Sequence, residues 1–211
     1  MTGILTTVVA PLSTRLTTRA NVKLDLKISG SADDDYIDLL IDRASSMIQP
    51  QIGRSLGSQT VTETYRAVAT SGRPLILSLF PVSAVASVVE GGVTLAVADF
   101  EKDNSTGFLW RLSADDRTSW CQTPVVVTYT AGWRLPNDAP IAGVVDLPFD
   151  IQDIALGLVR QAWFARGSDP TIRSEEAPGL GRVVYQTTGA SAMTLDDASA
   201  ERLRSYRSVV I

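Results

Sequence analysis

Three aspartates come closest to a catalytic arrangement in this sequence. Asp103 precedes a turn-like run, and Asp115 and Asp116 are adjacent in a polar loop. Two carboxylates held close together can act as general acid and general base in hydrolysis. The sequence contains no histidine, the residue that most often supplies a general base. A histidine-free hydrolase that uses Asp103, Asp115 or Asp116 is therefore one hypothesis, and it requires a cleft that brings two of these carboxylates together.

The remaining polar clusters have simpler explanations. The run from Asp103 to Gly107 has the composition of a calcium loop but lacks its spacing and its distal glutamate, and it is typical of a hairpin turn. The acids at 33–35 could bind a cation, yet acids at this position also stabilise the start of a helix. We therefore predict no catalytic residue, no metal site and no cofactor.

The composition favours a folded protein with a sizeable hydrophobic core. The chain has 211 residues, of which 45% are hydrophobic, and its formal net charge is −4. An acidic chain does not favour a surface that grips nucleic acid, and no apolar run approaches the roughly 18 residues of a membrane span. Only three of the 19 basic residues are lysines. Arginine is the cation that protein interfaces prefer, although a GC-rich genome also raises its frequency.

Four segments have the apolar spacing of helices, near 18–26, 33–52, 149–166 and 195–207. The second and third carry the apolar stripes that we expect to pack into one core, and the third is apolar nearly all round. A helix of that kind is buried on more than one side, so we expect it to contact the β region or another subunit as well. The residues predicted for this core and subunit packing are Ile37, Leu40, Ile41, Ile48, Ile154, Leu158 and Trp163.

Between the helical segments, residues 60–133 alternate with the period of two that is typical of strands. The prediction is an α+β protein, mainly a helical bundle with an antiparallel β insertion near 60–133. The expected divisions are an N-terminal arm with the first helices (1–58), the β insertion (59–134), the second core helix (135–167), and a C-terminal arm with the terminal helix (168–211).

Three stretches resemble the head–tail connector, or adaptor, proteins of long-tailed phages and phage-like gene transfer agents. The first is the short helix followed by DDDYIDLLIDRASSMIQPQIGRSL, and the second is VVVTYTAGWRLPNDAP leading into LPFDIQDIALGLVRQAWFAR. The third is TIRSEEAPGLGRVVYQ, followed by a terminal helix that ends in LRSYR. The resemblance rests on the order and spacing of these stretches, which together span most of residues 18–207.

The resemblance implies a structural protein of the virion neck with no catalytic residues. By resemblance, twelve copies form a ring between the portal protein and the next neck or tail protein. The ring extends the DNA channel, and DNA is only a non-specific passing cargo. Such a ring is assembled in the bacterial host cytoplasm and involves no membrane. A different neck component, such as a tail-completion or stopper protein, remains the alternative.

The C-terminal segment is the predicted portal-binding element. A polar run rich in glycine and proline tethers it, and from Ser199 onward three arginines stand against Glu201, a local charge of +2. Such a segment suits an acidic partner surface, although a short terminal helix can also pack on its own chain. The predicted portal-binding residues are Arg202, Arg204, Tyr206, Arg207, Val209, Val210 and Ile211.

Overall fold

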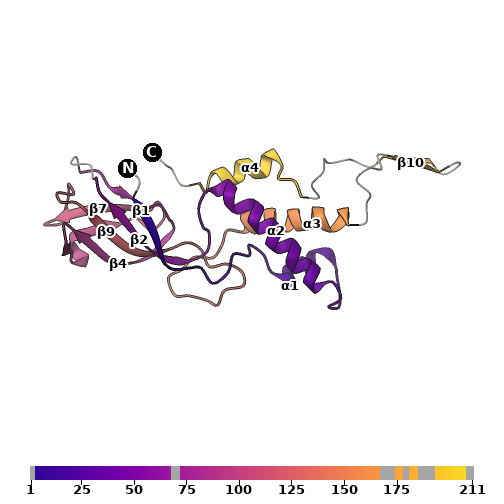
Figure 1. The fold of residues 1–211 in the computed structure, drawn as a ribbon, viewed down its shortest axis with the longest axis horizontal. Helices are drawn as coiled ribbons and strands as arrows, with labels where there is room; N and C mark the ends of the chain where they lie inside the picture. The colour runs from indigo at the N-terminus through magenta and orange to yellow at the C-terminus, as the bar shows by residue number, and fades with distance from the viewer. Residues whose placement is uncertain (1–2, 68–71, 167–173, 178–180, 185–192, 208–211) are drawn as a thin grey trace. The chain divides into compact units, whose positions relative to one another are not determined.

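A computed structural model describes residues 3–67, 72–166, 174–177, 181–184 and 193–207. The chain forms two compact units (Figure 1). The β unit comprises Met1–Thr14, Ile52–Leu147 and Tyr206–Ile211, and the helical unit comprises Arg15–Gln51 and Pro148–Ser205. Each unit is therefore built from segments that are distant in the sequence. Within the described ranges, no helix is both long and apolar enough to cross a membrane.

The β unit contains a five-stranded antiparallel sheet in the order β1-β2-β9-β4-β5 (Figure 1). Its central pair, β2 and β9, is in continuous register from Gln59↔Ala131 to Tyr65↔Val125. Side chains of both strands are alternately buried and half-buried, as expected for a sheet with one face on the core. The strands of this sheet are β1 (Ile4–Val9), β2 (Gln59–Tyr65), β4 (Val82–Glu90), β5 (Val93–Thr94) and β9 (Val125–Ala131).

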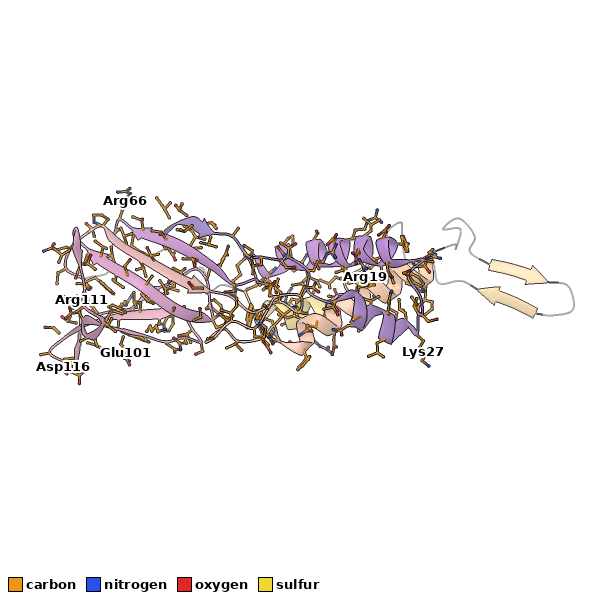
Figure 2. The ribbon with its side chains drawn as sticks, turned by 90° about the horizontal axis from the view of Figure 1, so that it is seen from below. Arg19, Lys27, Arg66, Glu101, Arg111 and Asp116 are labelled. Carbon is orange, nitrogen blue, oxygen red and sulfur yellow. The ribbon has the colours of Figure 1, made fainter. Side chains whose placement is uncertain are left out.

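A second, smaller sheet completes the core of the β unit. It contains β3 (Leu75–Ile76), β7 (Phe108–Ser113), β6 (Phe100–Lys102) and, paired with β7, β8 (Asp116–Thr118). A 3-10 turn at Val97–Asp99 leads into β6. Val61, Val127 and Tyr129 of the first sheet share one buried cluster with Leu109 of β7 and with Trp120. Arg111 of β7 (Figure 2) donates a hydrogen bond of 2.9 Å to Glu90 at the end of β4, which links the two sheets.

The helical unit contains α1 (Arg19–Leu26), α2 (Asp34–Ile52, whose last residue belongs to the β unit), α3 (Phe149–Ala165) and α4 (Asp197–Arg204). Thr18 and Asp196 cap α1 and α4 by accepting hydrogen bonds from the backbone N–H of Asn21 (3.1 Å) and of Ser199 (2.9 Å). This pattern is the usual way to satisfy the free N–H groups of a first turn. The strands β10 (Ser174–Ala177) and β11 (Gly181–Val184) pair as an antiparallel ribbon between α3 and α4 in the sequence.

The residues predicted for helix packing lie inside the helical unit. Ile37, Leu40, Ile41, Ile48, Ile154 and Leu158 are buried. Trp163 is half-buried, and its ring lies 6.0 Å from the ring of Tyr36 of α2. Ion pairs surround this interior, including Arg166 of α3 with Asp33 (2.7 Å) and Arg160 of α3 with Asp25 of α1.

The prediction of a mainly helical bundle is wrong, because the chain is mainly β with two antiparallel sheets. The helical segments are long and periodic, so their signal in the sequence extends over many residues. The strands are shorter, but together they enclose a hydrophobic cluster of their own. The N-terminal stretch, expected as an arm, forms β1 and adds a fifth strand to the first sheet. The β region lies between the two segments of the helical unit in the sequence, yet it forms a unit with a core of its own.

Candidate interaction surfaces

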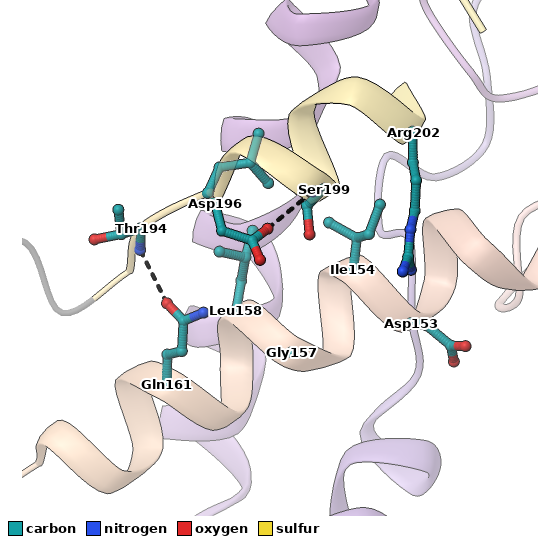
Figure 3. A pocket seen from close by; sticks show the side chains of 10 residues that line it. Asp153, Ile154, Gly157, Leu158, Gln161, Thr194, Asp196, Ser199 and Arg202 are labelled. Carbon is teal, nitrogen blue, oxygen red and sulfur yellow. Dashed lines mark hydrogen bonds between the residues drawn. The ribbon is translucent and has the colours of Figure 1, made fainter. Parts of the chain in front are cut away.

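A shallow pocket of about 220 Å³ lies between α3 and the segment that leads into α4 (Figure 3). The cap of α4 shapes one wall, where Ser199 donates its backbone N–H to Asp196. On the other wall, the side chain of Gln161 accepts a hydrogen bond of 3.1 Å from the backbone N–H of Thr194. The residues that line the pocket are Asp153, Ile154, Gly157, Leu158, Gln161, Thr194, Leu195, Asp196, Ser199 and Arg202.

The pocket has an apolar floor and a charged rim. Ile154 and Leu158 are buried, and Gly157 leaves open space, since a Cβ added there would meet no atom within 4 Å. Asp196 carries its charge readily, because hydrogen bonds from Ser199 lower the pKa of its carboxyl group. An apolar floor with a mixed-charge rim suits an apolar side chain of a protein partner better than a small charged metabolite.

Two exposed aromatic side chains lie on the same face of α3. Phe149 is 82% exposed and Phe164 is 68% exposed. At 100° per residue, both share a helix face with Asp153, Gly157 and Gln161 of the pocket. Aromatic side chains, phenylalanine among them, are enriched in protein interfaces relative to the rest of the surface. The prediction that this helix contacts something on a second side therefore has a concrete location, the face that carries Phe149 and Phe164.

A second polar arrangement holds the C-terminal end of the described chain within the β unit. The guanidinium group of Arg54 lies over the rings of Phe80 (3.7 Å) and Trp133 (4.7 Å). Its Nε donates a hydrogen bond of 3.0 Å to the carbonyl oxygen of Tyr206, and Nη1 donates to the carbonyl oxygen of Phe80. The Tyr206 ring also meets the Trp133 ring edge-on, 5.8 Å between centroids. We call these four residues the Arg54 clamp.

Among the described residues, the Arg54 clamp buries a positive charge without a carboxylate partner. Arg54 is 8% exposed, and burial lowers its pKa to about 10. Its Nη2 is buried and has no hydrogen-bond partner in the described part of the chain. Aromatic faces and carbonyl oxygens offset part of the desolvation of a guanidinium group. The clamp therefore fixes the position of Tyr206 rather than offering an anion site open to solvent.

The residues predicted to bind the portal lie in different surroundings. Arg202 is exposed at the pocket rim, Arg204 is exposed and pairs with Glu201 (2.7 Å), and Arg207 is exposed. Tyr206 is half-buried in the Arg54 clamp. Val209, Val210 and Ile211 lie outside the described residues.

The structure does not bring the candidate catalytic aspartates into the pocket. Asp103 lies in the turn between β6 and β7, while Asp115 and Asp116 lie at the turn between β7 and β8. Asp103 accepts hydrogen bonds from Ser105 and Thr106, which lower its pKa to about 2 and close the turn. In the part of the chain that the structure covers, no group of three or more acidic or cysteine side chains could hold a metal ion.

Sequence reasoning missed Arg54 and Glu63, which both occupy buried positions in the β unit. Arg54 directly follows the glycine that ends α2, so it was indistinguishable from an ordinary solvated residue beyond a helix. Glu63 did carry a signal, because it shares the strand phase of Val61 and Tyr65, both of which are buried. An acid at an inward position predicts a buried polar network, and the structure contains one.

Comparison with solved structures finds the same fold in chains of gene transfer agent (GTA) particles. A chain in the neck of an empty GTA particle, computed with C6 symmetry, superposes with a TM-score of 0.54 at 19% identity, covering 99% of this chain and 97% of that one. A chain in the neck of a native GTA particle, computed with C12 symmetry, gives 0.53 at 18% identity with the same coverage. A chain in the virion of a native gene transfer agent particle gives 0.52 at 17% identity, again with that coverage. At this identity the likeness shows a shared fold.

Comparison with curated proteins finds no match. The family model of the head completion proteins matches residues 15–149, more than half of the chain. The match ends at residue 149, where α3 begins. It therefore includes the first of the three stretches that carry the sequence resemblance and the second as far as the start of α3. The match confirms that resemblance. The chain therefore belongs to the head completion protein family.

Proposed function

We propose that this protein is a structural component of the neck of a phage or phage-like particle, where it completes the head and joins it to the tail. The observation that carries the proposal is the family match over residues 15–149. The shared fold with chains from GTA necks, which extends over 99% of this chain, supports the same location. In this role the protein works by binding its neighbours in the particle, so its function depends on its interaction surfaces.

The proposed arrangement is a ring of copies beneath the portal that continues the DNA channel. Chains with this fold lie in GTA necks that were computed with C6 and with C12 symmetry. The C12 symmetry favours a ring of twelve copies. A net charge of −4 suits a channel through which DNA must move without binding. The face of α3 that carries Phe149 and Phe164, together with the pocket beside it, offers an apolar surface for the next protein of the neck.

The C-terminal segment remains our proposed contact with the portal. In the described chain, α4 packs on its own unit through the buried Leu203, and the Arg54 clamp holds Tyr206. Arg202 and Arg207 are both exposed. A segment that carries positively charged side chains in solvent suits an acidic portal surface.

The first experiment removes the protein from the producing strain. We expect heads that fill with DNA but gain no tails, and tails restored when the wild-type gene is supplied. A map of the particle neck would then locate the protein directly below the portal or further along, which separates an adaptor from a stopper. Tailed, infective particles that lack the protein would contradict the proposal. A chain with Asp103, Asp115 and Asp116 all changed to asparagine should also restore tails, since no reaction is involved.

The second experiment tests the portal contact. The double change Arg202→Glu and Arg207→Glu should leave the melting temperature near that of the wild type and weaken binding to isolated portal rings. Arg43→Glu is the control, because Arg43 is an exposed arginine on α2, in the helical unit to which Arg202 also belongs. If the double variant binds portal rings as the wild type does, the C-terminal segment is not the contact.

A further inference from the structure

We infer that neighbouring copies meet through opposite edges of the five-stranded sheet: β1 of one copy packs against the turn around β5 of the next. This inference rests on the proposed ring and adds the surfaces that would form it. Its elements are two uncharged, apolar edges of one sheet, residues 3–12 on one side and 91–98 on the other.

β1 is an edge strand with apolar side chains that the protein leaves in solvent. It pairs with β2 on one side, and all six of its residues are exposed. Because successive side chains of a strand point to opposite faces, neither face of β1 is covered. Val8 is 59% exposed, and Ile4, Leu5 and Val9 are exposed as well. Long, apolar edge strands of this kind associate with other chains unless something covers them.

The opposite edge of the same sheet carries the second apolar surface. β5 follows a turn at Gly91 and Gly92 and pairs with the end of β4. Val93 is 64% exposed, and Val97, in the 3-10 turn that follows, is 82% exposed. Residues 91–98 contain no charged side chain, and neither do residues 3–12, in a protein that is 20% charged. Depletion of charge is the compositional feature that marks the core of an interface.

The start of β4 is already occupied, which favours the β5 turn for the contact. Lys102 of β6 donates a hydrogen bond of 3.3 Å to the carbonyl oxygen of Ser83. The backbone N–H of Val82 donates to the carbonyl oxygen of Asn104 at 2.7 Å. A neighbouring strand could not pair with these two residues without breaking these bonds. The other end of that edge carries the apolar turn with Val93 and Val97.

The sheet order places the two surfaces where a ring needs them. β1 and β5 are the first and last strands of one sheet, so one subunit presents two different surfaces on opposite edges. Contacts between two different surfaces propagate from copy to copy and close into a ring when the rotation allows it, whereas contact of a surface with itself stops at a dimer. A second copy of this chain is therefore the partner that fits both edges at once.

Thiol crosslinking in assembled particles tests the contact. The background carries Cys121→Ser, because Cys121 is an exposed free cysteine. In it, Val8→Cys combined with Val93→Cys should give, after a short bis-maleimide, a ladder of dimers, trimers and larger oligomers on a denaturing gel. The matched control is Val145→Cys with Val93→Cys, since Val145 is also an exposed valine of the β unit, and it should give no ladder.

The outcomes separate this inference from the proposed function. Particles that contain the double variant but give no ladder would overturn the edge contact and leave the neck assignment standing. A dimer from Val8→Cys alone would show β1 against β1 and would also overturn it. Tailed, infective particles that lack the protein altogether would overturn both proposals. As a second measure, Val8→Lys and Val93→Glu should each impair ring assembly while the folded protein keeps its melting temperature, and combining them should restore assembly.

Discussion

The two units of this protein differ in where they place charged side chains. Among the described residues, every buried charged side chain belongs to the β unit: Arg54, Glu63 and Glu90. The buried polar residues of the helical unit are the uncharged Thr17 and Ser45. The helical unit instead places its ion pairs around a mainly apolar interior, and Arg19 in Figure 2 is one of the side chains that take part.

The buried carboxylate of Glu63 shows what the β unit gains. It accepts hydrogen bonds from the backbone N–H of Ser78 (3.0 Å), the Ser78 hydroxyl (2.6 Å) and the Tyr129 hydroxyl (2.8 Å). Tyr129 in turn accepts a hydrogen bond of 3.3 Å from the backbone N–H of Leu79. Burial and the nearby Glu63 charge raise the pKa of the Tyr129 hydroxyl far above its ordinary value, so it remains a donor. The network fixes the segment after β3 onto β2 and β9.

The difference indicates how each unit specifies its shape. A mainly apolar interior is held by close packing, whereas a buried polar network is held by the one arrangement that satisfies all its groups. The helical unit should therefore respond to lost volume, and the β unit to lost hydrogen bonds. The predictions below test this contrast from the largest expected effect to the smallest.

The largest effect is expected from truncating the helical core. Leu158→Ala removes a buried side chain from the middle of α3 and should lower the free energy of unfolding by about 2–5 kcal/mol, the range for a closely packed leucine. Urea unfolding followed by circular dichroism measures this change. Leu24→Ala on α1 is the control, because Leu24 is exposed. An unchanged unfolding midpoint for Leu158→Ala would show that α3 is not packed as described.

A smaller effect is expected in the β unit. Glu63→Gln keeps the shape of the side chain but replaces one acceptor oxygen with a donor, so a hydrogen bond from Ser78 or Tyr129 is lost. Leaving a buried polar group unpaired costs about 1–3 kcal/mol. Glu101→Gln is the matched control, because Glu101 is exposed and pairs with Arg117 on the surface. If Glu63→Gln and Glu101→Gln are equally stable, the buried carboxylate of Glu63 stabilises the protein no more than a surface acid does.

The same contrast explains which parts of the fold were predictable from the sequence. The helices α1, α2 and α3 extend over residues expected to be helical, because an apolar stripe repeated over many turns is a strong local signal. That the chain is mainly β was not predictable in this way, because the core of the β unit joins residues as distant in the sequence as Val61 and Val127. Arg54 was missed because its partners, Phe80, Trp133 and Tyr206, are brought together only by the fold.

The smallest effect concerns acid and the surface ion pairs of the helical unit. Hydrogen bonds from Arg19 lower the pKa of Asp38, and those from Lys23 lower the pKa of Asp34. A carboxylate whose pKa is lower in the folded state binds fewer protons there than in the unfolded chain. Its contribution to stability is therefore complete above the ordinary aspartate pKa of about 3.9 and is lost as the pH falls through the folded value.

We therefore expect the melting temperature to fall as the pH is lowered below about 4, and Asp38→Asn to reduce the slope of that fall. At neutral pH this variant should lose less stability than Glu63→Gln, because a surface ion pair is worth less than a buried hydrogen bond. Asp35→Asn in the first turn of α2 is the control, because Asp35 is an exposed acid on the same helix. If Asp38→Asn and Asp35→Asn give the same pH dependence, the ion pairs around α1 and α2 do not stabilise the helical unit.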